Sequence, residues 1–158
     1  MPQLHETCSP NGMTQGIQEI IQRVHSIASF DRSMQPEFVQ CDSEAMTLTV
    51  RYRVLPWMLG ADQMLHSGIF TAMADDTMGV LADYSAGGPG TPTIAMEVNH
   101  LHPAPSGASL LFRSQLCSLG ERMIHMSIVC YEESSPETML LSGTGIYYRP
   151  TNRPRDQI

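Results

Sequence analysis

The 158-residue sequence contains no lysine, because all nine of its basic residues are arginine. This absence excludes Schiff-base and pyridoxal chemistry and the Walker phosphate loop, since each of these needs a lysine ammonium group. A phosphate group bound by this chain must therefore be held by arginine, by backbone N–H groups or by a helix N-terminus.

Charged residues of either sign are also few. They make up 16% of the chain, against about 25% in an average soluble domain. This shortage indicates that part of the surface is covered, most simply by oligomerisation. The net charge of −7 argues against a nucleic-acid partner. No apolar run approaches the ~20 residues of a membrane-spanning helix, and residues 1–11 lack the basic and apolar regions of a secretory signal.

The four cysteines form no CxxC pair. Cys41, Cys117 and Cys130 lie in strand-like runs, where a buried reduced thiol is the simplest interpretation, and Cys8 lies near the N-terminus. We therefore expect a cytoplasmic protein without disulfides.

The spacing of apolar residues predicts an α+β fold. Apolar residues recur at helical spacing over 14–29, and strict alternation over 46–54 predicts a strand. A second helix, rich in Ala and Met, is expected over 67–84. Further strands are expected at 38–41, 93–102, 109–118, 122–131 and 139–148. Turn residues between the last four strands predict antiparallel hairpins.

This order of elements contains no alternating strand–helix repeat, so a parallel sheet is not expected. An antiparallel sheet of five to six strands packed around one long central helix, with an additional N-terminal helix, fits the pattern. We expect a single domain over 13–149, a mobile tail over 1–12 and a C-terminal tail over 150–158.

Two adjacent carboxylates, Asp75 and Asp76, interrupt the otherwise apolar second helix. Burial of an ionised carboxylate is costly unless the group is paired or used. Asp75 shares its helix face with small residues, which allow another backbone to approach closely. These residues are Gly68, Ala72, Gly79, Ala82 and Ala86. Asp75 is therefore a candidate to contact a ligand, while a solvated or hydrogen-bonded helix residue is the alternative for either aspartate.

The helix opens with His66, Ser67 and Gly68. Free N–H groups at a helix start form the positive end of the helix dipole, which suits a carbonyl oxygen that gains negative charge. Ser67 can equally be a plain N-cap, and His66 a loop residue bonded to the backbone. Asp75 lies nine residues after His66, roughly 13–14 Å along the axis. One acyl carbon can contact both sites only if they come from two chains with antiparallel helices.

Several short motifs, in this order and spacing, resemble the hotdog-fold acyl-CoA thioesterases over about residues 45–148. The resemblance is to the phenylacetic-acid-pathway branch of the 4-hydroxybenzoyl-CoA thioesterase superfamily. The motifs are Leu65-His66-Ser67-Gly68, Met73-Ala74-Asp75, the segment 93–104 with Gly107, and Gly120-Glu121-Arg122.

The resemblance implies a hotdog fold and hydrolysis of an acyl-CoA thioester without metal or cofactor. Asp75 would act as nucleophile or general base. The backbone N–H of Ser67, with that of Gly68, would polarise the carbonyl from the partner chain, and His66 would shape this site. Thr93 would orient the attacking water. A homodimer or homotetramer is implied.

The sequence departs from the family at two positions. Ser67 replaces the first glycine of the helix-opening motif, and Gly60 stands where many relatives carry asparagine. Asp62 or Gln63 are the candidates to replace that asparagine. We expect Gly60, Gln63 and Arg122 to contact substrate, and Arg113 and Arg149 are further candidates on charge for the CoA nucleotide.

Other functions remain open. A non-catalytic acyl-CoA-binding or assembly protein is the alternative to an enzyme. His100 and His102 would share a strand face and could ligate zinc, although no third ligand is near in sequence. A serine hydrolase is disfavoured because no Gly-x-Ser-x-Gly motif is present. A hotdog dehydratase is disfavoured because no histidine follows Asp75 on the helix.

Overall fold

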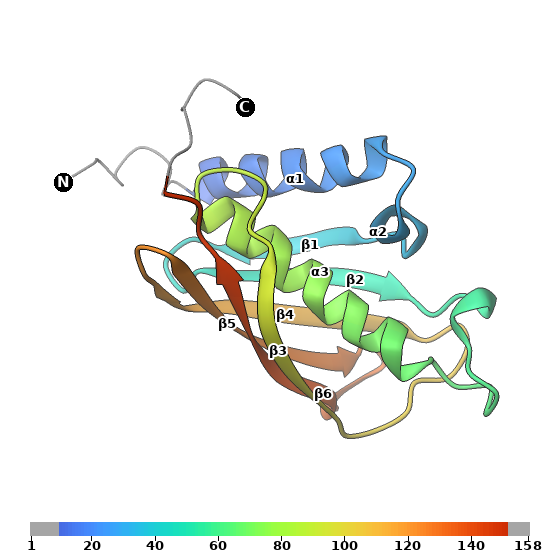
Figure 1. Cartoon of the computed structure of the whole chain (residues 1–158). Coiled ribbons are helices and arrows are strands. Elements are labelled where there is room, and N and C mark those ends of the chain that lie inside the picture. Colours follow the sequence, from blue (N-terminus) through green and yellow to red (C-terminus); the bar gives the residue numbers. More distant parts are fainter. Residues whose placement is uncertain (1–9, 152–158) are drawn as a thin grey trace.

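The computed structural model describes residues 10–151. The elements in chain order are α1 (Pro10–Ser26), α2 (Phe30–Ser33), β1 (Glu37–Asp42), β2 (Thr47–Arg53), the 3-10 turn η1 (Pro56–Met58), α3 (Ser67–Ser85), β3 (Thr93–His100), β4 (Ser109–Leu119), β5 (Met123–Glu132) and β6 (Ser135–Tyr148). All strands form one antiparallel sheet in the order β1-β2-β4-β5-β6-β3. The sheet curves around α3, and α1 lies beside α3 (Figure 1).

The strand partners of the second half differ in part from the prediction. The hairpins β4–β5 and β5–β6 are present, but β3 pairs with β6 and not with β4. The segment 101–108 therefore connects β3 at the sheet edge to β4 in the middle of the sheet. The sequence did not predict this, because turn residues show where the chain reverses but not which strand pairs with which. β6 begins at Ser135, so Ser135 and Pro136 belong to the strand and not to the turn. A proline is tolerated there because it lies at the start of the strand.

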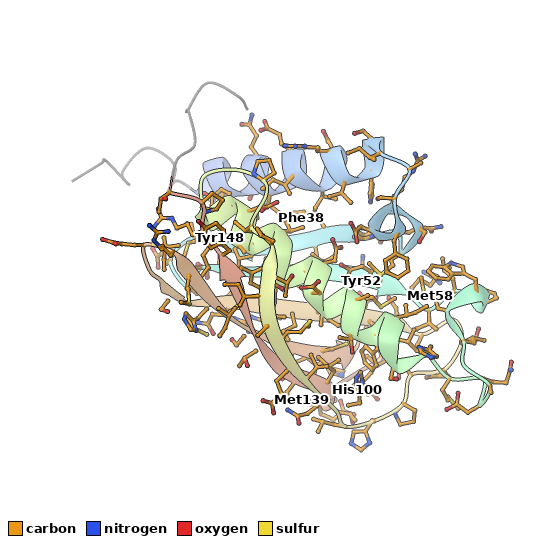
Figure 2. The ribbon with its side chains drawn as sticks, viewed as in Figure 1. Phe38, Tyr52, Met58, His100, Met139 and Tyr148 are labelled. Atoms are coloured by element: carbon orange, nitrogen blue, oxygen red, sulfur yellow. The ribbon has the colours of Figure 1, made fainter. Side chains whose placement is uncertain are left out.

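The core forms between α3 and the concave face of the sheet. The strand predicted over 46–54 is confirmed as β2, and its Leu48, Val50 and Tyr52 are buried in the core. Thr47 and Thr49 of the other face are buried as well, so burial does not alternate along the whole strand. A row of ring contacts links β2, β4, α3 and β3. It joins Tyr52 to Phe112 (5.3 Å between centroids), Phe112 to Phe70 (5.7 Å) and Phe70 to His100 (5.4 Å). These contacts fix α3 relative to the sheet. Figure 2 labels Tyr52 and His100, the two ends of this row.

The N-terminal helix α1 covers part of α3 and β1. Its buried residues are Met13, Ile17 and Ile21, spaced by four as an amphipathic helix requires. The helix begins at Pro10 and ends at Ser26, so positions 10–12 belong to it and not to the expected tail. The remaining expected tail residues, 1–9 and 152–158, lie outside the described part of the chain.

The cysteines differ in exposure. Cys130 is buried, Cys41 is half-buried and Cys117 is exposed, so the expected burial is wrong for Cys117. All three are free thiols, and burial raises the pKa of Cys130. Cys8 lies outside the described residues. No helix within residues 10–151 has the length and apolarity to cross a membrane.

Gly143 of β6 allows the close approach of β3. A Cβ at this position would fall on the carbonyl oxygen of Glu97 and against the side chain of Val98. The pairing of β3 with β6 therefore depends on the absence of a side chain at Gly143.

We expect Gly143→Ala to destabilise the protein by about 1–3 kcal/mol, because β3 must move away from β6 to admit the methyl group. Urea-induced unfolding measures the change. Thr144→Ala, at the exposed neighbouring position, is the control and should cost less than about 0.5 kcal/mol. Equal stability of the two variants would show that the sheet accommodates the methyl group.

Candidate active site

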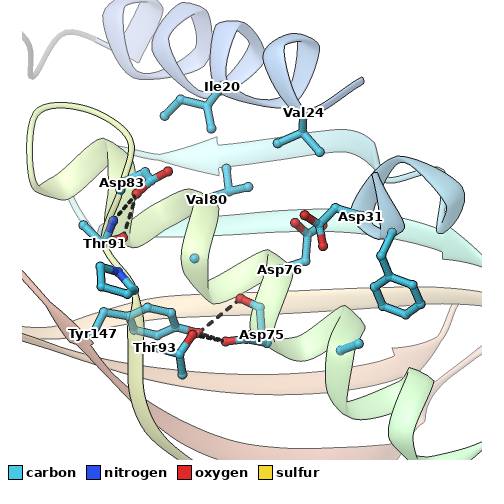
Figure 3. A pocket seen from close by; sticks show the side chains of 15 residues that line it. Ile20, Val24, Asp31, Asp75, Asp76, Val80, Asp83, Thr91, Thr93 and Tyr147 are labelled. Carbon is cyan, nitrogen blue, oxygen red and sulfur yellow. Dashed lines mark hydrogen bonds between the residues drawn. The ribbon is translucent and has the colours of Figure 1, made fainter. Parts of the chain in front are cut away.

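A cavity of about 410 Å³ lies between α1, α2, α3 and the segment that leads into β3 (Figure 3). Its lining mixes apolar side chains with four carboxylates. The residues that line it are Ile20, Val24, Phe30, Asp31, Ala72, Asp75, Asp76, Gly79, Val80, Asp83, Gly90, Thr91, Pro92, Thr93 and Tyr147.

Asp75 is held at the wall of this cavity by two hydroxyl groups. Thr93 Oγ1 and the Tyr147 hydroxyl each donate to Asp75 Oδ1 at 2.8 Å. The Tyr147 hydroxyl also lies 3.1 Å from the Asp75 backbone carbonyl. The second carboxylate oxygen, Oδ2, accepts no hydrogen bond from the described residues, so it can accept one from water or a ligand.

Tyr147 was not predicted as a site residue. The alternation of β6 places it on the inward face of the sheet, which was a usable signal, but its contact with Asp75 spans 72 positions. Burial, followed by the charge of Asp75, raises the pKa of Tyr147. The hydroxyl therefore keeps its proton and remains a donor to Asp75.

Asp76 lines the same cavity as Asp75 but has a different hydrogen-bond partner. Tyr52, fully buried in β2, donates its hydroxyl to Asp76 Oδ2 at 2.6 Å. Burial raises the pKa of Asp76 to about 6, the hydrogen bond from Tyr52 opposes this, and the nearby charges of Asp31 and Asp75 add to the rise. Asp76 is therefore a tethered carboxylate and not a solvated helix residue.

The start of α3 forms a second group of residues. His66 is the N-cap of α3, and its Nδ1 accepts the N–H of Gly68 at 3.0 Å. The N–H of Ser67 has no hydrogen-bond partner among the described residues. The open amide that sequence reasoning expected is therefore that of Ser67, while that of Gly68 is engaged by the imidazole.

The loop before α3 packs against this helix start. The N–H of Gly60 donates to the carbonyl of Met64 at 2.8 Å, and a Cβ on Gly60 would lie 3.8 Å from the His66 ring. Asp62 accepts the N–H of Met64 at 3.1 Å, so its carboxylate has a role within the loop. Gln63 is exposed and adopts a positive φ of 63° at the turn.

Two separate groups thus lie at different points along α3, each with a residue from another segment. Asp75 and Thr93 meet in one group, and His66, Ser67 and Gly60 meet in the other. Nine helical residues separate Asp75 from His66, which corresponds to roughly 13–14 Å. Within a single chain these groups do not converge on one atom.

The arginine candidates lie in two places, because the N–H of Arg149 donates to the carbonyl of Arg122 at 2.8 Å and Arg113 lies elsewhere. Arg122 is exposed and precedes Met123, which pairs with Tyr148 at the same end of the sheet as Thr93. Arg149 donates to the carbonyl of Gly120 at 3.0 Å and closes the β4–β5 turn. Arg113 is exposed on the outer face of β4, away from the cavity.

The two histidines do not share a strand face as expected, because β3 ends at His100 and His102 lies beyond it. His100 packs on Phe70, and its Nε2 lies 3.2 Å from Thr71 Oγ1. Over residues 10–151 no group of three or more His, Cys, Asp or Glu side chains is arranged to hold a metal ion.

Comparisons with known proteins confirm the resemblance to hotdog-fold thioesterases. The family model described as the thioesterase superfamily matches residues 62–138. No curated protein matches the sequence.

Several solved structures share the fold at low sequence identity. The PaaI protein of the E. coli phenylacetic acid degradation operon has 15% identity and a TM-score of 0.72, covering 87% of this chain and 96% of its own. Thioesterase superfamily member 2 from Mus musculus has 15% identity and a TM-score of 0.74, with 87% and 98% covered. The smu.793 protein of Streptococcus mutans UA159, solved with acetyl CoA, has 17% identity and a TM-score of 0.69, with 82% and 98% covered. These likenesses confirm the predicted hotdog fold.

The raised pKa of Asp76 predicts a pH-dependent stability effect. The pKa of Asp76 is about 6 in the folded protein, against an ordinary pKa of 3.8. The folded state therefore holds the proton more tightly than the unfolded state, and the protein loses stability as the pH rises from about 4 to 6 and Asp76 ionises. Asp76→Asn removes the charge and keeps an oxygen that accepts from Tyr52. We expect the variant to be more stable than wild type by about 1–3 kcal/mol at pH 8, with the gain lost below pH 4.

Urea-induced unfolding at both pH values measures this difference. Glu44→Gln, which removes an exposed carboxylate in the β1–β2 turn, is the control and should show little change. A gain that is the same at pH 8 and pH 4 would contradict the assignment of the effect to the Asp76 charge.

Proposed function

Because the chain has the hotdog fold and carries the thioesterase-superfamily sequence pattern over residues 62–138, we propose that it hydrolyses an acyl-CoA thioester to the free acid and thiol. The observation that carries this proposal is the Asp75 carboxylate at a cavity wall, with one oxygen fixed by Thr93 and Tyr147. The binding of acetyl CoA by the S. mutans protein of the same fold supports an acyl-CoA ligand.

The chemistry needs few groups because a thioester is already activated toward attack. With Asp75 as general base, its carboxylate takes a proton from water as the water oxygen adds to the carbonyl carbon. The C–S bond then breaks, and the proton passes to the departing thiolate. With Asp75 as nucleophile, its carboxylate oxygen adds to the carbonyl carbon and the C–S bond breaks, which gives an acyl-aspartyl anhydride and the CoA thiolate. Water then cleaves the anhydride to the free acid and the Asp75 carboxylate, and a proton from this water passes to the thiolate. In either course, Thr93 and Tyr147 keep the carboxylate in place.

Negative charge that develops on the carbonyl oxygen requires a donor, and we assign this role to the N–H of Ser67 from a second chain. The distance between Asp75 and Ser67 along α3 requires two antiparallel helices, and hence a homodimer or a tetramer built from dimers. The exposed edge of β3 supports such an association, since Ile94 is 53% exposed there. His66 then orients this corner, with Gly60 and Gln63 beside the substrate and Arg122 available to the CoA phosphates.

A non-catalytic acyl-CoA-binding protein is the second candidate. Gly60 favours it, because a glycine supplies no side chain where many relatives carry asparagine, and the Asp62 carboxylate is engaged within the loop. Thioester binding without release of thiol would support this candidate over hydrolysis.

We expect Asp75→Asn to lower kcat/KM by at least about 100-fold, since the amide can neither attack the carbonyl nor take a proton from water. Thiol release from a panel of acyl-CoA thioesters measures the rate. Glu137→Gln, which removes the charge of an exposed carboxylate on β6, is the control and should retain full activity. Full turnover by the Asp75 variant would exclude this mechanism.

The shared site is tested by two inactive variants that complement each other. Ser67→Pro removes the N–H that we assign to the carbonyl oxygen. Proline is well suited to the first position of a helix, and His66 has the extended backbone (φ −60°, ψ 130°) that a following proline requires. We expect Ser67→Pro to be folded but inactive, and Ser67→Ala, which keeps the N–H, to be active.

Co-expression of Ser67→Pro with Asp75→Asn should then restore about one quarter of wild-type activity. Half of the randomly formed dimers are mixed, and each mixed dimer contains one intact site. Restoration is measured as thiol release by the purified mixed protein. A mixture as inactive as its components would contradict a site shared between chains.

A further inference from the structure

The charged side chains that line the candidate acyl cavity are all negative. Four aspartates are among the residues that line it, and no arginine or histidine of the described chain lines it. One of the four, Asp83, is engaged locally, because its Oδ1 accepts the N–H and the hydroxyl of Thr91 at 3.0 and 2.7 Å. Asp75 belongs to the proposed reaction. Asp31 and Asp76 remain, and neither is used by that reaction.

Asp31 of α2 and Asp76 of α3 both line the cavity, and their carboxylates point toward each other (Figure 3). Asp76 accepts a single hydrogen bond, from Tyr52. Asp31 accepts no hydrogen bond from the described residues and has no cationic partner among them. The repulsion between the two groups contributes to the raised pKa of Asp76. The negative potential in this part of the cavity is therefore not neutralised by the protein.

Apart from the hydroxyl groups of Thr91, Thr93 and Tyr147, the rest of the lining is apolar. Ile20 and Val24 of α1 point toward Val80 of α3 (Figure 3). Phe30, which precedes Asp31 in α2, also lines the cavity. A hydrocarbon acyl chain can displace water from these surfaces favourably. An acyl chain that ends in a carboxylate would instead place a third negative charge near Asp31 and Asp76. This carboxylate would lose part of its hydration, and none of the described residues that line the cavity is cationic.

We propose that Asp31 and Asp76 select against acyl groups that end in a carboxylate, so that the substrates of this protein are acyl-CoA thioesters with an uncharged acyl group. This inference rests on the proposed function, since it takes the cavity beside Asp75 as the acyl site. It assigns Asp31 and Asp76 a role in specificity through charge repulsion, which is distinct from the role of Asp75 in the reaction.

The test compares two thioesters of equal chain length, hexanoyl-CoA and adipyl-CoA, which differ in a terminal carboxylate. With the full-length wild-type protein, we expect kcat/KM for adipyl-CoA to be at least about 100-fold lower than for hexanoyl-CoA. Asp31→Asn should raise the adipyl-to-hexanoyl ratio at least about ten-fold, because it removes one of the repelling charges. Asp76→Asn, which keeps an acceptor for Tyr52, should change the ratio in the same direction.

Glu44→Gln is the matched control, since it makes the same change in net charge far from the cavity and should leave the ratio unaltered. Equal hydrolysis of both thioesters by wild type, or a ratio unchanged in both aspartate variants, would overturn the proposed selectivity.

Binding of the same two thioesters to Asp75→Asn, measured by calorimetry, separates this inference from the proposed function. If the wild-type protein hydrolyses no thioester and Asp75→Asn binds hexanoyl-CoA at least ten-fold more tightly than adipyl-CoA, the proposed function is overturned and the selectivity is supported. Equal binding of the two would overturn the selectivity, whatever the rates of hydrolysis.

Discussion

The enclosure of α3 by the curved sheet is the constraint on which the other features depend. Phe70, Met73 and Leu81 bury the sheet side of the helix, and this fixes its rotation about its own axis. Successive helical residues lie about 100° apart, so the adjacent aspartates must face different surroundings. Asp75 is directed to the hydroxyl donors of β3 and β6, and Asp76 to a buried tyrosine of β2. Similar side chains one position apart thereby acquire different chemistry.

The same rigid helix separates two polar groups that a thioester would need together. The open amide of Ser67 lies at its N-terminus, and the Asp75 carboxylate lies more than two turns along. A helix cannot bend to bring these groups together without breaking its own hydrogen bonds. The small residues Ala72 and Gly79 leave room beside Asp75 for the cavity, and the N-terminal helix α1 covers that cavity with apolar side chains. Reactivity and selectivity therefore depend on how other segments approach α3.

Much of the fold followed from local patterns in the sequence. The alternation of apolar and polar residues predicted β2, and turn residues predicted the hairpins that join β4, β5 and β6. The apolar content of α3 and the residues at its two ends predicted a helix over 67–84, which is within one residue of the observed end. The family resemblance pointed to Asp75 and Thr93, and the structure brings them within hydrogen-bond distance. The alternation and turn patterns reflect interactions between residues close in sequence. The family resemblance rests on short motifs that occur in a characteristic order along the chain.

Other features were decided only by tertiary structure. The pairing of β3 with β6, the contact of Tyr147 with Asp75 and the position of Asp31 opposite Asp76 join segments that are far apart in sequence. No periodicity encodes such contacts, because many partners satisfy the same local pattern and the packing of the whole chain selects among them. Which amide of the helix start remains open was likewise determined by the fold of the His66 side chain onto Gly68. The sequence by itself thus determined the elements and the candidate carboxylate, whereas long-range packing decided what surrounds that carboxylate.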